Sequence, residues 1–428
     1  MFSRKSFLQT SAMALSGTAL GGSITPSMPA TALSDLSLYP HGPDPVKDET
    51  YWELVRNYFP RPEGYINLEN GYFSHQPVST LQKHQELEQD INKRNSYFMR
   101  REHYTAVENA RHALSGFLGV GPEELALTRN TTESLNIVIG GYRWKKGDEV
   151  IIGNQDYGSM VQAFQQASAR YGIKIKTAQV PLHPKSDAEV IEAYTRHLGK
   201  KTRMVHLTHV INLTGQVIPV SAIADACRTR NVLVVVDAAH SVAQLEFKLP
   251  DLKADIVAGS LHKWMCAPLG LGFLQMKQAH IPKFWPLMAD LDHPETNIRH
   301  FEHQGTKPIH SLIALGEAIR FHHQIGGTLK QNRLRYLMQY WTTRVEKFPG
   351  LSLLNPHTDN ARNCAIANVR VDGYAPSDLA EKLMNEFQIF TVAIEHRVVN
   401  GVRITPHLST SLQDLDALVS ALKGICGG

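Results

Sequence analysis

Seven short apolar runs, most of them separated by helical patterns, constrain the fold of this 428-residue chain more than any other feature. Short runs rich in valine, isoleucine and leucine are typical of strands that are buried on both faces. Their alternation with helices indicates crossover connections, and hence an α/β fold with a mainly parallel seven-stranded sheet flanked by helices. The expected strands are residues 124–128, 149–153, 173–178, 203–210, 232–237, 255–260 and 270–276.

The remaining segments predict helices and a second domain. Two helical patterns lie between Ser79 and Gly119, and the second ends at a glycine stop. Beyond Pro308 the pattern changes to long helices over 311–327 and 329–348, then strand-like pieces and a final helix over 412–425, which indicates a smaller α+β C-terminal domain. The expected divisions are 1–32 (export signal), 33–68 (an N-terminal arm joining the small domain), 69–307 (large domain) and 308–428 (small domain).

The first 32 residues have the layout of a cleaved export signal: a basic start, a moderately apolar stretch, then Ala-Thr-Ala. Arg4, Phe7 and Leu8 also match the twin-arginine export motif, although Lys5 stands where the second arginine is usual. We therefore expect a periplasmic or otherwise exported protein. The alternative is a cytoplasmic protein with an amphipathic or disordered N-terminal tail. No other segment has an apolar run long enough to span a bilayer.

Composition excludes several classes of protein. With 43% hydrophobic and 20% charged residues, the chain can bury a large core and is neither disordered nor fibrous. The formal net charge is +4, and loss of Arg4 and Lys5 with the signal leaves 4 − 2 = +2 on the mature chain. Nucleic acid binding therefore lacks electrostatic support. The spacing of the four cysteines matches no set of metal ligands and no dense disulfide framework. The histidines are scattered and lack the carboxylate or cysteine partners that a metal site needs.

Asp237 and Lys263 follow two successive strand-like runs, 263 − 237 = 26 positions apart. In a parallel sheet both side chains would lie at the carboxyl edge, where open α/β folds bind ligands. Pyridoxal 5'-phosphate needs a lysine amine for covalent attachment and a carboxylate that keeps its ring nitrogen protonated. The alternative is a solvated lysine after a core strand, but the flanking Ser260 and His262 and the upstream aspartate favour the cofactor.

Three motifs, VDAAHS, GSLHKW and EHQGTKPIHS, resemble the class V aminotransferase group of fold type I pyridoxal phosphate enzymes, which includes cysteine desulfurases and isopenicillin N epimerase. The similarity runs from about Tyr65 to the last helix, and several motifs in the right order are more specific than any one of them. The resemblance implies the fold type I architecture, catalysis by Lys263 with Asp237, and pyridoxal 5'-phosphate as the cofactor.

The resemblance also implies a phosphate site. Thr131 and Thr132 open a helix after a predicted strand, where backbone amides and hydroxyls can hold a phosphate. An ordinary helix cap is equally compatible with these residues. Asn130 stands where many relatives have glycine, which leaves the geometry of this loop open. By the same resemblance, Ser260 and His262 would complete the site.

QGTKP matches a glycine-threonine loop that reaches the phosphate held by a neighbouring subunit. Carried over to Gly305 and Thr306, this implies a homodimer with shared active sites. The competing interpretation is a simple turn before a helix.

Other cofactor contacts are implied in the same way. Tyr157 follows a strand where relatives place an aromatic ring over the cofactor, and such stacking needs only a rigid ring. Asn212 and His240 resemble residues that bond the phenolic oxygen of the cofactor. His240 departs from the glutamine of cysteine desulfurases, but a neutral imidazole can still donate one hydrogen bond; as an alternative it could cap the following helix.

The substrate side rests mostly on the resemblance. Arg403 resembles the arginine of the C-terminal domain that grips the substrate α-carboxylate, a contact that suits a planar guanidinium. Asn70 and Gly71 match an early loop that lines the substrate side.

The expected function is that of an enzyme acting on a small-molecule or peptide substrate with a primary amine next to a carboxylate. Racemisation or epimerisation, transamination, C–S lysis and decarboxylation all stay open. Cysteine desulfuration is disfavoured, because Cys364 directly enters a strand instead of lying on a mobile loop.

Two alternatives stand beside this prediction. Export combined with this fold resembles the periplasmic enzymes that tailor the siderophore pyoverdine by modifying the glutamate of a peptide precursor. A catalytically silent scaffold is the other alternative, but a scaffold would need none of Asp237, Lys263 and Arg403.

Overall fold

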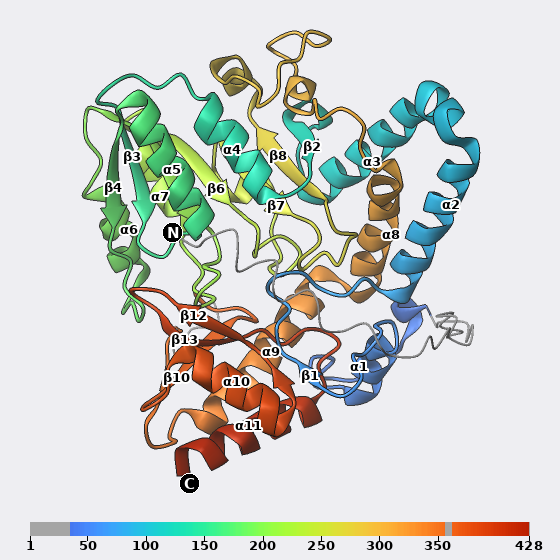
Figure 1. Cartoon of the computed structure of the whole chain (residues 1–428), viewed down its shortest axis with the longest axis vertical. Coiled ribbons are helices and arrows are strands. Elements are labelled where there is room, and N and C mark those ends of the chain that lie inside the picture. Colours follow the sequence, from blue (N-terminus) through green and yellow to red (C-terminus); the bar gives the residue numbers. More distant parts are fainter. Residues whose placement is uncertain (1–34, 356–361, 428) are drawn as a thin grey trace, which may run out of the picture. The chain divides into compact units, whose positions relative to one another are not determined.

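The computed structural model describes residues 35–355 and 362–427 (Figure 1). The predicted export signal lies outside these described residues. The large sheet of the protein has seven strands: β2 (Leu125–Thr128), β3 (Glu149–Gly153), β4 (Lys174–Ala178), β5 (Thr202–Thr208), β6 (Leu233–Asp237), β7 (Ile256–Ser260) and β8 (Gly272–Met276).

The strand order in this sheet is β2-β8-β7-β6-β5-β3-β4. β8 is antiparallel to both of its neighbours, and the other pairs are parallel. All seven predicted strands and the mainly parallel α/β architecture are confirmed, because such apolar runs can be buried only inside a sheet that is covered on both faces.

Helices α2 to α8 surround the sheet. They are α2 (Val78–Arg101), α3 (His103–Leu118), α4 (Thr131–Gly141), α5 (Gly158–Tyr171), α6 (Asp187–Thr195), α7 (Val220–Arg228) and α8 (Ile309–Ile325). Helix α1 (Glu49–Arg56) lies away from the sheet, where Glu49 pairs with Arg333 of α9 (Gly327–Val345) (Figure 1). Short 3₁₀ turns cover Leu36–Leu38, Pro122–Glu124, Leu249–Leu252, Gln278–Lys283 and Ile298–Phe301. The predicted glycine stop is confirmed: Gly119 ends α3 with φ of 74°, a left-handed conformation that favours glycine.

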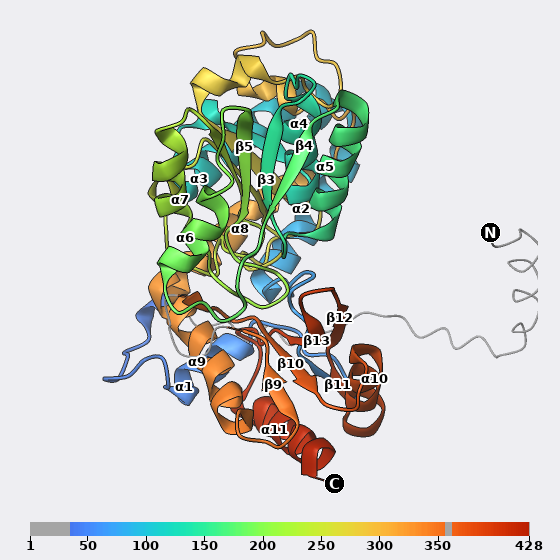
Figure 2. The same ribbon diagram turned by 90° about the vertical axis from the view of Figure 1, so that its left-hand side faces the viewer.

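The side chains of successive strand residues point to opposite faces of the sheet. In β3, Ile151 packs into one core with residues of α3, α7 and α8, whereas Val150 and Ile152 pack into a second core with residues of α4 and α5. Figure 2 shows these two helical layers on either side of the strands. Two apolar faces explain why the strands read as continuous hydrophobic runs.

The C-terminal part forms a second layered unit around its own core. Its elements are β9 (Leu351–Leu353), β10 (Ala367–Val371), β11 (Ile389–Phe390), β12 (Val392–Glu395), β13 (Asn400–Ile404), α9 (Gly327–Val345), α10 (Pro376–Phe387) and α11 (Leu412–Gly427). The antiparallel order is β12-β13-β10-β9, and β11 pairs in parallel with β1 (Ile66–Asn67) from the start of the chain.

Helix α8 packs mainly along α2 and α3, beside the large sheet (Figure 1). The predicted division at residues 307 and 308 therefore places α8 with the small domain although its neighbours are helices of the large one. The domain boundaries stay a prediction. Within the described residues, no helix is both long and apolar enough to cross a membrane.

Candidate functional site

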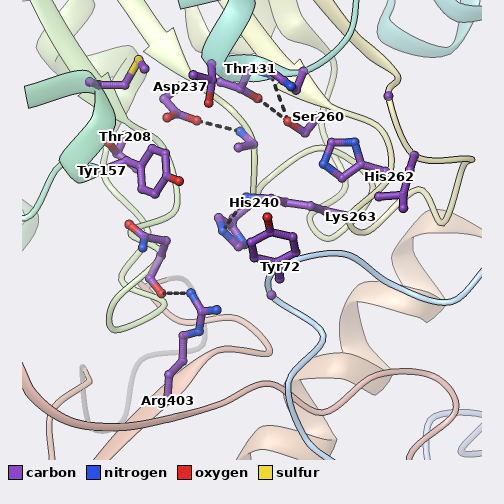
Figure 3. Close-up of a pocket in the computed structure, with 18 residues that line it drawn as sticks. Tyr72, Thr131, Tyr157, Thr208, Asp237, His240, Ser260, His262, Lys263 and Arg403 are labelled. Atoms are coloured by element: carbon purple, nitrogen blue, oxygen red, sulfur yellow. Dashed lines mark hydrogen bonds between the residues drawn. The ribbon is translucent and has the colours of Figure 1, made fainter. Parts of the chain in front are cut away.

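The carboxyl ends of the parallel strands surround a cavity of about 360 Å³ (Figure 3). Thr208, Asp237 and Ser260 are the last residues of β5, β6 and β7, and Thr131 begins α4. A cavity of this size suits a small organic ligand. The predicted site residues that line it are Gly71, Thr131, Thr132, Tyr157, Asn212, Asp237, His240, Ser260, His262, Lys263 and Arg403.

One end of the cavity is rich in hydrogen-bond donors. The Thr131 amide donates to the Ser260 hydroxyl at 3.0 Å, and the two side-chain hydroxyls lie 2.8 Å apart. Asn130 caps α4 by accepting from the Glu133 amide at 2.9 Å. The Asn130 backbone is extended, with φ of −173°, a conformation that any residue adopts, so the asparagine fits this loop without strain. A Cβ on Gly272 would lie 2.6 Å from the Asn130 Cα, so this close approach requires a glycine in β8.

His262 adds an imidazole to the same end. Its Nδ1 is buried and has no hydrogen-bond partner within the protein. Burial, followed by the charge of Lys263, lowers the pKa of His262 to about 4. An anion in the cavity would stabilise the imidazolium and raise that pKa. The hydroxyls, the start of α4 and this imidazole therefore suit a phosphate group.

Asp237 supplies a buried carboxyl group next to the donor-rich end. One of its oxygens accepts from the Ala239 amide at 2.9 Å. Burial raises the pKa of Asp237 above its ordinary value, although His206 opposes this shift. A cationic ring nitrogen in the cavity would stabilise the carboxylate and reverse the effect of burial.

Lys263 directs its amine into the cavity. Its Nζ lies 2.9 Å from Nε2 of His240 (Figure 3). Burial lowers the pKa of Lys263 to about 8, although Asp237 favours its charged form. A lysine with such a pKa has an appreciable uncharged fraction at neutral pH, which a nucleophilic amine requires. Burial and the nearby Lys263 hold the pKa of His240 well below its ordinary value, so this imidazole is neutral.

Arg403 lies on the opposite side of the cavity, in a buried ion pair with Glu69. Its Nη2 and Nε donate to the Glu69 carboxylate at 2.5 and 3.3 Å, and Nη1 donates to the Asn212 carbonyl at 3.1 Å. These bonds leave one N–H on each terminal nitrogen, the edge that suits a bidentate carboxylate. A Cβ on Gly71 would lie 2.9 Å from Nη2, so a larger residue here would require the Arg403 guanidinium to shift.

The rim of the cavity is apolar and exposed. Tyr157, Tyr72 and Leu269 line it with exposed fractions of 44%, 77% and 55%. The Tyr157 ring follows β3, where the sequence predicts an aromatic ring over the cofactor. A rigid aromatic ring at this place can cover a flat ligand.

Three predicted residues do not line the cavity. Asn70 is buried, and its side-chain amide donates to the Thr405 carbonyl at 2.8 Å, so it holds the loop that carries Gly71. Gly305 and Thr306 are exposed, and Gly305 lines a separate cavity of about 200 Å³. Their predicted role on a phosphate requires a second subunit and stays a prediction.

The four cysteines, all in the described part of the chain, are unpaired thiols. Cys364 is buried just before β10, with its sulfur 3.4 Å from the Gly215 carbonyl oxygen. Burial raises the pKa of Cys364 to about 12, which disfavours the nucleophilic thiolate. Among residues 35–355 and 362–427, no three His, Cys, Asp or Glu side chains gather as a metal site.

Sequence reasoning missed several residues of the site. Tyr72 and Trp264 directly follow Gly71 and Lys263, so adjacency to a predicted residue was an available signal. No such signal joins Glu69 to Arg403, because 334 positions separate them.

Together these groups fit pyridoxal phosphate. The cavity offers a donor-rich end for a phosphate, a buried carboxyl group for a ring nitrogen, an amine of lowered pKa and an aromatic side chain. Asn212 also has a buried side-chain oxygen without a protein partner, so the site contains a polar group that a ligand can satisfy.

Comparisons with known proteins agree with this arrangement. The family model "Aminotransferase class-V" matches residues 72–416. Isopenicillin N epimerase from Streptomyces clavuligerus is 26% identical over 392 residues, covering 88% of this chain and 98% of that protein. A probable cysteine desulfurase from Synechocystis is 29% identical over 350 residues, covering 76% and 82%.

Solved structures show the same fold. A variant of the enzyme C-DES, with glycine covalently linked to its pyridoxal phosphate cofactor, superposes with a TM-score of 0.77. That structure is 21% identical in sequence and covers 86% of this chain and 98% of the other. At this identity the likeness establishes the architecture only.

Proposed function

This chain belongs to the class V aminotransferase family of pyridoxal phosphate enzymes, and from that premise we propose that it breaks a bond at the α-carbon of an amino acid, free or linked to a peptide. The observation that carries the proposal is one cavity that holds Lys263, Asp237 and Arg403. An amine, a carboxylate for the cofactor and a guanidinium for the substrate are the groups that such chemistry needs.

The side chains divide the work between them. Thr131 and Ser260 would hold the cofactor phosphate, and Asp237 would hold its ring nitrogen. When bound, the cofactor supplies an electron sink for negative charge at the substrate α-carbon. Arg403 binds the α-carboxylate through its two open N–H groups. Lys263 moves the proton at the α-carbon, which its lowered pKa allows near neutral pH.

The reaction is identified by following the α-carbon directly. The holoprotein is incubated in deuterium oxide with L- and D-amino acids, while absorbance and product mass are recorded. Deuterium uptake with inversion indicates epimerisation, a keto acid indicates transamination, and loss of carbon dioxide or of a thiol indicates decarboxylation or lysis. If no amine exchanges its α-proton or forms product, the proposal is wrong.

A peptide-linked substrate is the finer form of this proposal. The exposed apolar rim of Tyr72, Tyr157 and Leu269 suits a substrate whose body extends beyond the cavity. A siderophore precursor of the pyoverdine type, modified at its glutamate, is one such substrate. Its turnover in preference to free glutamate would support this form, and equal turnover would contradict it.

Desulfuration of free cysteine is not the proposed reaction. Replacing Cys364 with alanine is expected to leave activity within about twofold of the parent, because the buried thiol is protonated at neutral pH. Sulfide release from cysteine and turnover of the best substrate are both measured. Complete loss of activity with cofactor retained would identify Cys364 as a sulfur acceptor and overturn this view.

We also propose a homodimer in which Thr306 contacts a phosphate in the partner subunit. Thr306 is exposed, and the loop beside it is tied to α4 because Gln304 donates to Glu133 at 2.8 Å. Exposed Tyr104 lines the same cavity as Gly305, and exposed Leu291 stands between Asp290 and Asp292, which also line it; a second copy can cover these apolar side chains.

Replacing Thr306 with valine is expected to weaken cofactor binding by about tenfold to a hundredfold. A hydrogen bond to a charged group contributes roughly 1.5 to 3 kcal/mol, which corresponds to that range. Cofactor release on dilution is followed by absorbance and sedimentation, and Thr343→Val on exposed α9 surface is the matched control. A stable, fully loaded monomer would refute the shared site.

Export is the proposal for localisation, and it rests on the first 32 residues alone. The test is cell fractionation of the full chain and of a chain lacking residues 1–32. The shortened protein is expected to stay in the cytosol and to bind the cofactor. Normal export of the shortened protein would show that the signal lies elsewhere.

A further inference from the structure

A hydrogen-bonded chain of three side chains ends at the lysine amine. The indole Nε1 of Trp264 lies 3.3 Å from Nδ1 of His240, and Nε2 of the same ring lies 2.9 Å from Nζ of Lys263. Trp264 is fully buried and His240 is 4% exposed, so water does not compete for the contact between them, whereas the amine of Lys263 faces the cavity. Figure 3 shows the imidazole and the amine facing one another.

The indole determines which imidazole nitrogen carries the proton. An indole N–H can only donate, so Nδ1 of His240 must accept. The ring is neutral, because burial and the nearby positive charges of Lys263 and Arg403 disfavour an imidazolium. A neutral imidazole has a single N–H, so it lies on Nε2 and points at Lys263.

An N–H at this place distinguishes between the two forms of the lysine. A neutral amine has a lone pair and can accept this hydrogen bond, whereas an ammonium has three N–H groups and no lone pair. We propose that Trp264 is a positioning residue: by fixing the Nε2–H tautomer of His240, it favours the neutral, nucleophilic form of Lys263. The inference rests on the proposed function only in giving Lys263 the role of nucleophile.

The backbone around Trp264 supports this role. The Cys266 amide donates to the Lys263 carbonyl at 3.0 Å, closing a turn in which Cys266 has φ of 58°, a left-handed conformation. The buried amine of Lys330, on α9, donates to the Trp264 carbonyl. These contacts hold the backbone of Trp264, from which the indole reaches the imidazole.

Other groups that face Lys263 act in both directions. Asp237 at the end of β6 and Glu69 in the loop after β1 raise the lysine pKa, whereas burial and Arg403 on β13 lower it. His262 next to it is neutral at pH 7, since its pKa is about 4. None of these four residues donates a hydrogen bond to the amine among the contacts of the described residues, so the contribution of His240 is separable.

The test is Trp264→Phe, which retains an aromatic ring and removes the N–H. His240 is then free to carry its proton on Nδ1 and to accept from the Lys263 ammonium through Nε2. The lysine pKa is expected to rise by about one to two units. Covalent capture of added pyridoxal phosphate by the apoprotein at pH 7 should slow by about tenfold for each unit by which the lysine pKa rises. The pH profile of this capture should shift to higher pH by the same amount.

The matched control is Trp144→Phe. Trp144 is also a buried tryptophan whose indole donates a hydrogen bond, to the Ile139 carbonyl at 2.9 Å, and it does not line the cavity. Loss of the Trp144 indole N–H should leave the pH profile of cofactor capture unchanged. A profile shifted equally in both variants would reduce the effect to general destabilisation and overturn the proposal.

Two further measurements keep the outcome decisive. In apoprotein with ¹⁵N-labelled histidine, the His240 signals should show a bare Nδ1 and a protonated Nε2; the reverse pattern refutes the proposal even if Trp264→Phe does not fold. In a His240→Gln background, Trp264→Phe should cause no further shift of the pH profile. An unshifted profile in folded Trp264→Phe would overturn the inference and leave the proposed reaction standing.

Discussion

Replacing Lys263 with alanine is expected to abolish covalent attachment of the cofactor and to lower turnover below detection. The amine of Lys263 lines the cavity, and burial brings its pKa to about 8, so a nucleophile and a proton carrier are lost together. Borohydride reduction followed by mass measurement of the intact protein detects the attachment. Absorbance of the purified variant should also lack the yellow band of the parent.

The control for Lys263→Ala is Lys277→Ala. Lys277 pairs with Asp255 at 3.0 Å, and neither residue lines the cavity. Its removal should leave borohydride labelling complete. If borohydride still fixes the cofactor to Lys263→Ala, another amine performs the attachment and the assignment of Lys263 is wrong.

Replacing Asp237 with asparagine is expected to lower the rate by about 10² to 10⁴-fold with the fold retained. Loss of one partner from a buried ion pair costs about 3 to 5 kcal/mol, and each 1.36 kcal/mol corresponds to a tenfold change. An amide cannot balance a positive charge on the cofactor ring. Turnover and cofactor affinity are measured together, because both depend on that charge.

The same carboxyl group gives the enzyme a pH dependence with a defined sign. Burial raises the pKa of Asp237, so acid protonates it more readily than an ordinary aspartate, and cofactor retention should fall as pH falls. In Asp237→Asn, cofactor retention should no longer fall at low pH. The control is Asp255→Asn, at the amino end of β7, in which cofactor retention should still fall at low pH. An unchanged acid limb in Asp237→Asn would contradict the role of Asp237.

Local sequence pattern is sufficient to predict the large sheet and much of the site. Seven apolar runs predict a mainly parallel sheet that is covered on both faces, and the carboxyl ends of its parallel strands meet at one edge. Residues at or just after the ends of such runs, among them Asp237, Ser260 and Lys263, therefore share one cavity. This logic needs only local pattern and the geometry of a parallel sheet.

The contacts that set the charge states of these groups follow from the folded structure and not from local pattern. The ion pair of Arg403 with Glu69 joins segments that lie far apart in the chain, and the bond from Trp264 to His240 depends on how side chains pack beyond the ends of neighbouring strands β6 and β7. Local pattern predicts that a side chain reaches the sheet edge, but charge state and tautomer depend on burial and on partners distant in the chain. Sequence placed the reactive groups in one cavity, and the folded structure determined their protonation.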